Sequence, residues 1–225
     1  MSELNPPTKK MEETPNKVIQ DLVLVFTIVF ATDFLMADFL PQLYLFTILL
    51  WAALPFLVEL VLRKGTIRNL GFLRTNFRRS LPLYFALVVG WILIIFGLLE
   101  SITPHSQSSS LIEYSLYFAT IFFHPAFVEE LNFRGFLQTR LERLFSAKQS
   151  IIIQAVMFAA YHIPAALPIS KLGFSPGGIF YPVFALALGI ANGIVYAKTR
   201  NLFAGMAIHG SLLAAFELLT LLYMH

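Results

Sequence analysis

The sequence contains no cysteine and has few charged residues for its length. The absence of cysteine excludes disulfide bonds, thiol catalysis and cysteine-ligated metal sites. Only 13% of the 225 residues are charged, whereas soluble domains usually carry about 25%. With 57% hydrophobic residues and a mean hydropathy of +0.73, the chain has more apolar surface than a soluble core of this size can bury. We therefore expect an integral membrane protein, whose outer surface is also apolar.

The first residues are polar and rich in proline, and they lack the short apolar region and cleavage site of a signal peptide. This composition is typical of a disordered segment. We expect residues 1–17 to form a disordered cytosolic tail and residues 18–225 to form a single transmembrane domain, with a motif-bearing core at about 111–224.

Long apolar runs predict an all-α fold, a polytopic transmembrane helical bundle of about seven spans, since one span needs about 20 apolar residues. The predicted spans are residues 18–37, 41–62, 81–99, 111–132, 150–168, 178–197 and 202–224. Residues 134–148 have apolar side chains at helical spacing among Arg and Lys, which predicts an amphipathic helix on the membrane surface. The alternative is an extension of the fourth span into water.

The positions of the basic residues predict one orientation. Six Arg and Lys residues lie between the second and third spans, and others follow the fourth and sixth spans. Residues 100–113 contain no Lys or Arg. Because cytosolic loops are enriched in basic residues, this pattern places the N-terminus in the cytosol and the C-terminus outside.

Several ionisable residues lie inside the later predicted spans, where burial of charge is costly and usually marks a cavity or a partner. These residues are Glu129 and Glu130, with Arg134 after them, and His124, His162 and His209. At a rise of about 1.5 Å per residue, the carboxylates, His162 and His209 reach overlapping depths in the cytosolic half of the bilayer. We therefore expect two carboxylates and two imidazoles from three helices to converge in one pocket.

These residue types fit hydrolysis. A carboxylate beside an imidazole can hold and deprotonate a water, and a second imidazole can donate to an oxyanion. The same groups, Glu129, His162 and His209, could instead hold a divalent metal such as zinc. Arg134 lies four residues after Glu130 and can pair with it on one helix face, which leaves Glu129 to act on water. Each residue taken singly also has a structural interpretation, and we assign His124, which precedes a proline, to a structural role.

Three motifs occur in order in this part of the sequence. They are Glu129-Glu130-x-x-x-Arg134 with Gly135 after it, Phe158-x-x-x-His162, and His209 at the end of YAKTRNLFAGMAIH. Together they resemble the motifs of the CPBP intramembrane proteases, which include the CAAX prenyl proteases and bacteriocin-processing enzymes and are also called the abortive-infection family. The resemblance covers about residues 126–213, and the first three spans carry no matching motif.

The resemblance implies a role for each motif residue. Glu129 would activate water, and His162 would help to hold it. Glu130 and Arg134 would support the site, and His209 would stabilise the oxyanion or bind a metal. The sequence departs from the family where Asn or Asp usually lies four residues after the last His, because Leu213 occupies that position. Asn192 in the sixth span is an alternative donor.

Three functions are compatible with the sequence. The first is an intramembrane endopeptidase that cleaves a membrane-bound or lipidated protein or peptide, weakened by Leu213. The second is a non-catalytic relative with an immunity, regulatory or partner-binding role. The third is a transporter, which we disfavour because the ionisable groups gather in one half of the bilayer. We expect the lipid bilayer and a protein or peptide substrate as partners, no nucleic acid, and a location in the bacterial plasma (inner) membrane; the oligomeric state stays open.

Overall fold

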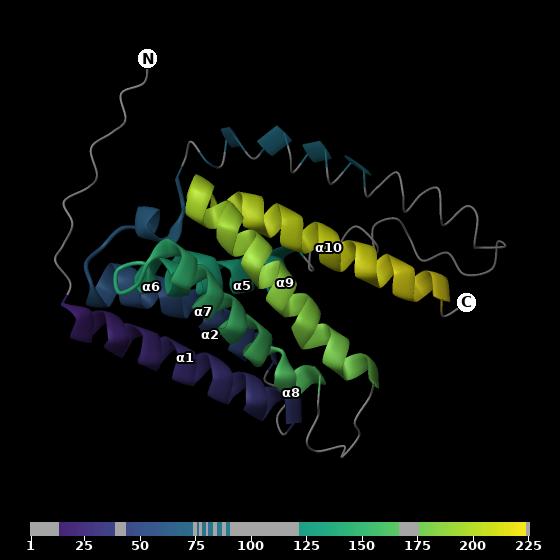
Figure 1. Ribbon diagram of the computed structural model, residues 1–225, viewed down its shortest axis with the longest axis horizontal. Helices are drawn as coiled ribbons and strands as arrows, with labels where there is room; N and C mark the ends of the chain where they lie inside the picture. The colour runs from purple at the N-terminus through teal and green to yellow at the C-terminus, as the bar shows by residue number, and fades with distance from the viewer. Residues whose placement is uncertain are drawn as a thin grey trace.

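A computed structural model describes residues 14–38, 44–73, 122–166 and 176–223, together with short pieces between 76 and 90 (Figure 1). Every regular element in these ranges is a helix, and no strand occurs in them, which confirms the all-α prediction. The predicted tail up to residue 13, most of the predicted third span, and the first part of the fourth lie outside the described residues.

The helices fall into an N-terminal group and a C-terminal group. The N-terminal helices are α1 (Pro15–Asp38), α2 (Tyr44–Phe56), η2 (Leu57–Leu62) and the short 3-10 helix η3 (Ile67–Leu70). A continuous helix over residues 122–141, the motif helix, consists of η4 (Phe122–Phe127), α5 (Val128–Glu130), η5 (Leu131–Gln138) and α6 (Thr139–Leu141). The C-terminal helices are α7 (Ala147–Tyr161), α8 (Ile163–Ala166), α9 (Pro176–Thr199) and α10 (Leu202–Tyr223).

The motif helix lies between the two groups. α1 packs against α2 on one side, and α7 packs along α9 on the other (Figure 1). The motif helix contacts α2, α7, α9 and α10. Aromatic rings fill part of the space around it: Phe133 lies 5.5 Å from Phe26 of α1 and 4.8 Å from Phe158 of α7, measured between ring centroids. The central position of this helix places its polar side chains in the interior.

The predicted amphipathic surface helix at residues 134–148 is wrong. Residues 134–138 are buried, and Arg134, Gln138 and Arg140 have no exposed surface. Residues 134–141 continue the preceding helix, as the alternative proposed, but other helices cover them instead of water; residues 145–148 are exposed. Arg134 and Arg140 are buried because each pairs with an acidic residue inside the bundle, as described below, whereas Arg143 and Lys148 are exposed.

Most predicted spans coincide with helices, although the number seven stays a prediction. In the described residues, three helical segments are long and apolar enough to cross a membrane: Pro15–Leu35, Leu45–Leu62 and Tyr181–Thr199. Leu202–Ala214 is a shorter apolar helix. The predicted fifth span is not one helix over residues 150–168, since α7 ends at Tyr161 and α8 follows from Ile163. Pro164 explains the interruption, because proline has no N–H to donate to the preceding turn.

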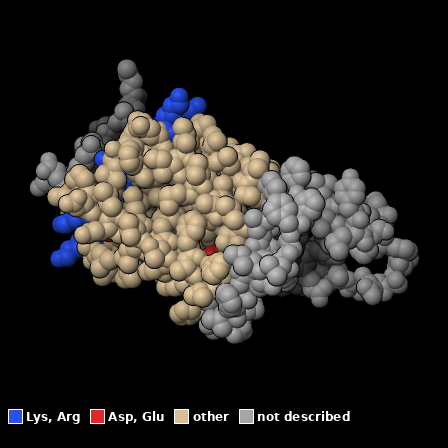
Figure 2. Space-filling model, turned by 60° about the horizontal axis from the view of Figure 1, so that its bottom comes forward, with Lys and Arg blue, Asp and Glu red and all other residues tan. Residues whose placement is uncertain are grey.

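The basic residues gather at one end of the bundle, which we call the basic end. It is formed by the start of α1, the end of η2, the end of α6 and the end of α9 (Figure 1). Figure 2 shows Lys and Arg side chains at the margins of the described surface and an almost uncharged area between them. This separation is what the distribution of positive charge in the sequence predicts for a membrane protein.

Candidate active site

Glu129, His162 and His209 come from three helices and meet around one carboxylate oxygen. Glu129 Oε2 lies 3.8 Å from His162 Nε2 and 3.6 Å from His209 Nε2. The oxygen is buried and has no hydrogen-bond partner among the described residues. Both separations are longer than a direct hydrogen bond, so the three groups face a common point without bonding to one another.

Glu130, the neighbouring carboxylate, is surrounded by donors. Its Oε1 atom lies 3.0 Å from Arg134 NH1 and 3.0 Å from His209 Nδ1, and it accepts a hydrogen bond of 2.9 Å from Asn192 Nδ2. The carboxylate and the guanidinium are both fully buried. Charge-assisted bonds of this kind are about twice as strong as neutral ones. Glu130 therefore links α5 to α9 and α10. Its Oε1 atom is occupied by these partners and cannot activate water.

Two glycines let other backbones approach the motif helix closely. A Cβ atom on Gly205 of α10 would lie 2.7 Å from Glu130 Oε2. A Cβ atom on Gly135 would lie 2.7 Å from the carbonyl oxygen of Leu70 in η3. The contact at Gly135 is with backbone, which cannot give way, so this position requires glycine; at Gly205 a side chain would displace the Glu130 carboxylate. The glycine that follows the Glu-Glu-x-x-x-Arg motif is thus explained by the docking of η3.

His162 has a defined orientation. It caps the end of α7, and its Nδ1 lies 2.8 Å from the carbonyl oxygen of Phe158. Because a carbonyl oxygen only accepts hydrogen bonds, Nδ1 carries the hydrogen and Nε2 of the neutral ring is an acceptor. That acceptor is the atom that faces Glu129.

His209 has the same orientation toward Glu129. Its Nδ1 donates to the Glu130 carboxylate, and its Nε2 faces Glu129. Nε2 is a donor when the ring carries hydrogen on both nitrogens. The ring of Phe158 separates the two histidines, with centroids 4.6 Å from His162 and 5.9 Å from His209.

Asn192 and Leu213 are the two positions at which the sequence could supply a further donor to the oxyanion, and neither does. Asn192 Nδ2 donates to Glu130 Oε1 and, at 3.3 Å, to the carbonyl oxygen of Gly205. Both of its hydrogens are therefore used, and it holds Glu130 instead of serving as an oxyanion donor. Leu213 is half-buried, one turn beyond His209 on α10, and offers no hydrogen bond. His124 lies in η4 and is also half-buried.

The fit of a divalent metal can be judged from the donor set. Within the described residues, no group of three or more His, Asp or Glu side chains is arranged to hold a metal ion. Glu129, His162 and His209 present one carboxylate oxygen and two nitrogens toward a common point, but they do not form such a group. We therefore assign no step to a metal.

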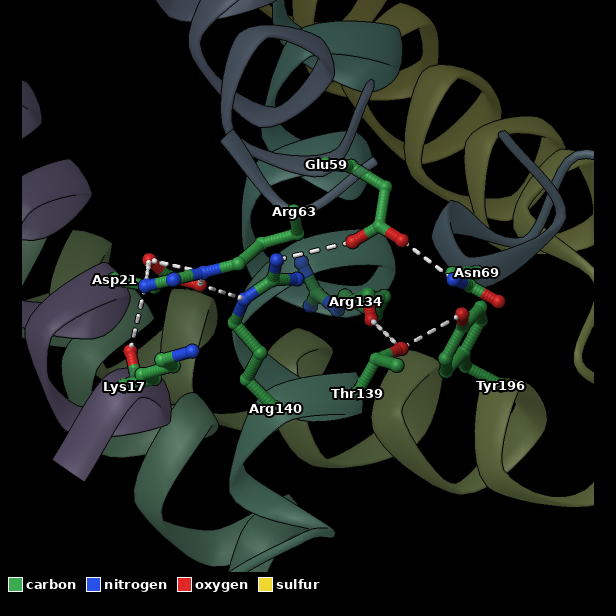
Figure 3. Close-up of polar contacts among 9 residues, drawn as sticks. All are labelled: Lys17, Asp21, Glu59, Arg63, Asn69, Arg134, Thr139, Arg140 and Tyr196. Carbon is green, nitrogen blue, oxygen red and sulfur yellow. Dashed lines mark hydrogen bonds and ion pairs between the residues drawn. The ribbon is translucent and has the colours of Figure 1, made fainter. Parts of the chain in front are cut away.

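A second group of charges, the ionic cluster, lies toward the basic end and was not anticipated from the sequence (Figure 3). Arg140 bonds Asp21 of α1 at 3.2 Å and Glu59 of η2 at 3.0 Å, and Arg63 pairs with the same Asp21. Asn69 also donates to Glu59. The sequence does place charges of opposite sign near the ends of the first two predicted spans. A charge at a span end is usually interpreted as facing water, so these charges did not predict a buried cluster.

The charged residues of the three motifs thus lie together, and comparison with known proteins shows what this part of the chain is similar to. Residues 110–214 match the family model described as type II CAAX prenyl endopeptidase Rce1-like. This segment is similar to that family. The match confirms the resemblance to the CPBP proteases and contains Glu129, Glu130, Arg134, His162 and His209. The Rce1-like family is a protease family, and with the apolar helices it supports an integral membrane peptidase. No curated protein and no solved structure matches the chain.

Proposed function

We propose that this protein is an intramembrane endopeptidase that hydrolyses a peptide bond in a membrane-bound or lipidated protein or peptide. The observation that carries the proposal is the position of Glu129 Oε2 between the Nε2 atoms of His162 and His209, at 3.8 and 3.6 Å. A water that bonds to Glu129 and His162 at this point lies against a carboxylate base and an imidazole acceptor. The Rce1-like match supports the same reaction.

The reaction then follows from the orientation of the three groups. Glu129 takes a proton from the water as the oxygen attacks the substrate carbonyl carbon, and His162 Nε2 accepts the second hydrogen of the water as a hydrogen bond. His209 Nε2 donates to the oxyanion that forms on the carbonyl oxygen. The proton on Glu129 passes to the departing amine when the carbon–nitrogen bond breaks. The products are a new carboxylate and a new amine.

Glu130 and Arg134 support this chemistry without taking part in it. Their buried ion pair fixes α5, and Glu130 also orients the His209 ring through Nδ1. Because Leu213 cannot donate a hydrogen bond, stabilisation of the oxyanion falls to His209, and we expect slow turnover. A missing donor of this kind costs about 10²–10³ in rate. We also propose that the site opens toward the cytosolic face of a bacterial plasma membrane, since the basic end of the bundle would face the cytosol.

The test is cleavage by the purified protein in liposomes. A farnesylated peptide that ends in a CAAX sequence is incubated with wild type in H₂¹⁸O, and the products are analysed by mass spectrometry. The proposal predicts one new carboxyl terminus that carries one ¹⁸O atom. A Glu129→Gln preparation serves as the control for contaminating proteases. If wild type produces no more product than this control, from this peptide or from a set of membrane-anchored peptides, the non-catalytic alternative replaces the proposal.

A further inference from the structure

Polar side chains form a stripe along the motif helix that extends beyond the candidate active site. Glu130, Arg134, Gln138 and Glu142 follow one another at intervals of four residues, so they share one helix face. Gln138 Nε2 donates to Glu142 Oε1 at 3.1 Å, and Glu142 pairs with Arg200 at 2.5 Å. The first three residues are fully buried, whereas the Arg200 side chain is 48% exposed. The stripe therefore connects the site to the surface at the basic end.

Three amides beside this stripe each keep one unused oxygen. Gln138 Nε2 donates to the carbonyl oxygen of Gly193 as well as to Glu142, and Gln154 Nε2 donates to the carbonyl oxygen of Gly189 at 2.7 Å. Asn192 Nδ2 donates to two acceptors, as described above. Because each nitrogen faces acceptors, the orientation of each amide is fixed and its oxygen is the remaining atom. These oxygens are buried and have no hydrogen-bond partner in the described part of the chain.

The unused oxygens lie on three different helices that face one another. Gln138 belongs to η5, Gln154 to α7 and Asn192 to α9. A Cβ atom on Gly193 would lie 2.6 Å from Gln154 Nε2 and 3.2 Å from Gln138 Oε1, so both glutamines converge where α9 has no side chain. Glu130 Oε2 and Arg134 Nε, further along the stripe, are also buried without a hydrogen-bond partner.

Buried acceptors and donors that lack protein partners are usually satisfied by ordered water, which needs two to four polar partners. Here such atoms occur from Gln138 to Glu130 along the interface between the motif helix, α7 and α9, which we call the seam. We propose that this seam is a hydrated path that carries water from the basic end to Glu129. As a supply of the hydrolytic water, the path rests on the proposed function; as a line of bound water, it does not.

The first test detects water directly. X-ray radiolysis of the full-length protein in liposomes oxidises side chains beside bound water, and mass spectrometry gives each rate relative to the unfolded chain. Tyr196, which is 3% exposed and bonds Thr139 beside the seam, should be oxidised about threefold or more faster than Phe26, which is 6% exposed among other aromatic rings. Equal protection of Tyr196 and Phe26 would overturn the proposal.

The second test narrows the seam. Gly193→Ala adds a methyl group between the two glutamines, and Ala191→Val adds bulk on the exposed side of the same helix as a control. We expect Gly193→Ala to lower both the oxidation of Tyr196 and kcat several-fold with KM unchanged, and the control to change neither. Gln154→Leu, which removes an acceptor at similar volume, replaces Gly193→Ala if that variant does not fold.

The possible results distinguish the hydrated path from the proposed peptidase function. Rapid oxidation of Tyr196 in a wild-type protein that cleaves no peptide would leave the hydrated path standing and remove the proposed function. Unchanged kcat in a variant whose Tyr196 oxidation has fallen would show that the hydrolytic water arrives by another route. Oxidation that does not respond to either variant would contradict the position of the path.

Discussion

At the scale of single residues, the two adjacent glutamates have different surroundings. One oxygen of Glu130 accepts hydrogen bonds from Asn192 and His209 and pairs with Arg134, whereas the Oε2 atom of Glu129 has no hydrogen-bond partner among the described residues and faces two imidazoles. The sequence alone presents them as an equivalent pair. The difference arises because a helix turns by about 100° per residue, so that neighbours point to different helices. The assignment of chemistry to Glu129 depends on this asymmetry.

Asn192 offers a test of how Glu130 is held. Asn192→Leu removes one of the donors to a buried carboxylate, and a hydrogen bond to a charged group contributes about 1.5–3 kcal/mol. We expect a lower thermal unfolding midpoint and reduced cleavage, because the His209 ring loses a fixed partner. Ile194→Leu, on the exposed side of α9, is the control, and its melting curve should match wild type. A stable, fully active Asn192→Leu protein would show that Arg134 and His209 suffice.

Leu213 offers a gain-of-function test. The family pattern has Asn or Asp at this position, one turn after His209 and on the same face of α10. Leu213→Asn should add a donor to the oxyanion and raise kcat, by up to about 10²-fold if the geometry is ideal. Leu213→Met, which keeps the volume and adds no donor, is the control. If the two variants cleave at the same rate, the oxyanion is stabilised elsewhere.

At the scale of elements, the site depends on how closely helices approach one another. Gly205→Ala would place a methyl group 2.7 Å from Glu130 Oε2 and displace the carboxylate or α10. Overpacking of this kind costs about 1–3 kcal/mol. Gly90→Ala is a matched control, because a Cβ atom there meets nothing within 4 Å. We expect thermal stability and cleavage to fall in Gly205→Ala alone, and similar melting curves for the two variants would argue against a tight contact.

The ionic cluster fixes α1 and α2 to the motif helix. Arg140→Met removes the shared partner of Asp21 and Glu59, and a buried charge that loses its partner costs about 3–5 kcal/mol. We expect a large fall in the unfolding midpoint, which Lys148→Met on the exposed start of α7 should not cause. Recovery of stability in the triple variant Arg140→Met, Asp21→Asn and Glu59→Gln would show that the loss comes from unpaired charge.

The sequence predicts the helices more completely than it predicts their packing. Apolar runs mark α1, α9 and α10 to within three residues at each end, because span length and composition are local properties. The convergence of Glu129, His162 and His209 could be expected from depth alone. The burial of Arg140 could not, since its partners Asp21 and Glu59 are distant in the sequence. For the same reason the segment after Arg134 was wrongly assigned to the membrane surface.

At the scale of the whole molecule, the absence of cysteine makes orientation in the membrane simple to measure with single introduced cysteines. Single cysteines at Lys64 and Lys198 should react with a membrane-impermeant maleimide only from the cytosolic side, because basic loops stay in the cytosol. A cysteine at Ser108, in the segment without Lys or Arg, should react only from outside. Labelling of all three from one side would contradict the predicted topology.

The central claim is that Glu129 performs the chemistry while Glu130 holds the structure. The most direct measurement compares cleavage rates and thermal unfolding midpoints of Glu129→Gln and Glu130→Gln in the same liposomes. We predict that Glu129→Gln loses about 10²–10⁴ in rate, the usual contribution of a general base, with its midpoint unchanged. Glu130→Gln should lose stability as well as rate. A Glu129→Gln protein that cleaves as fast as wild type would contradict the account.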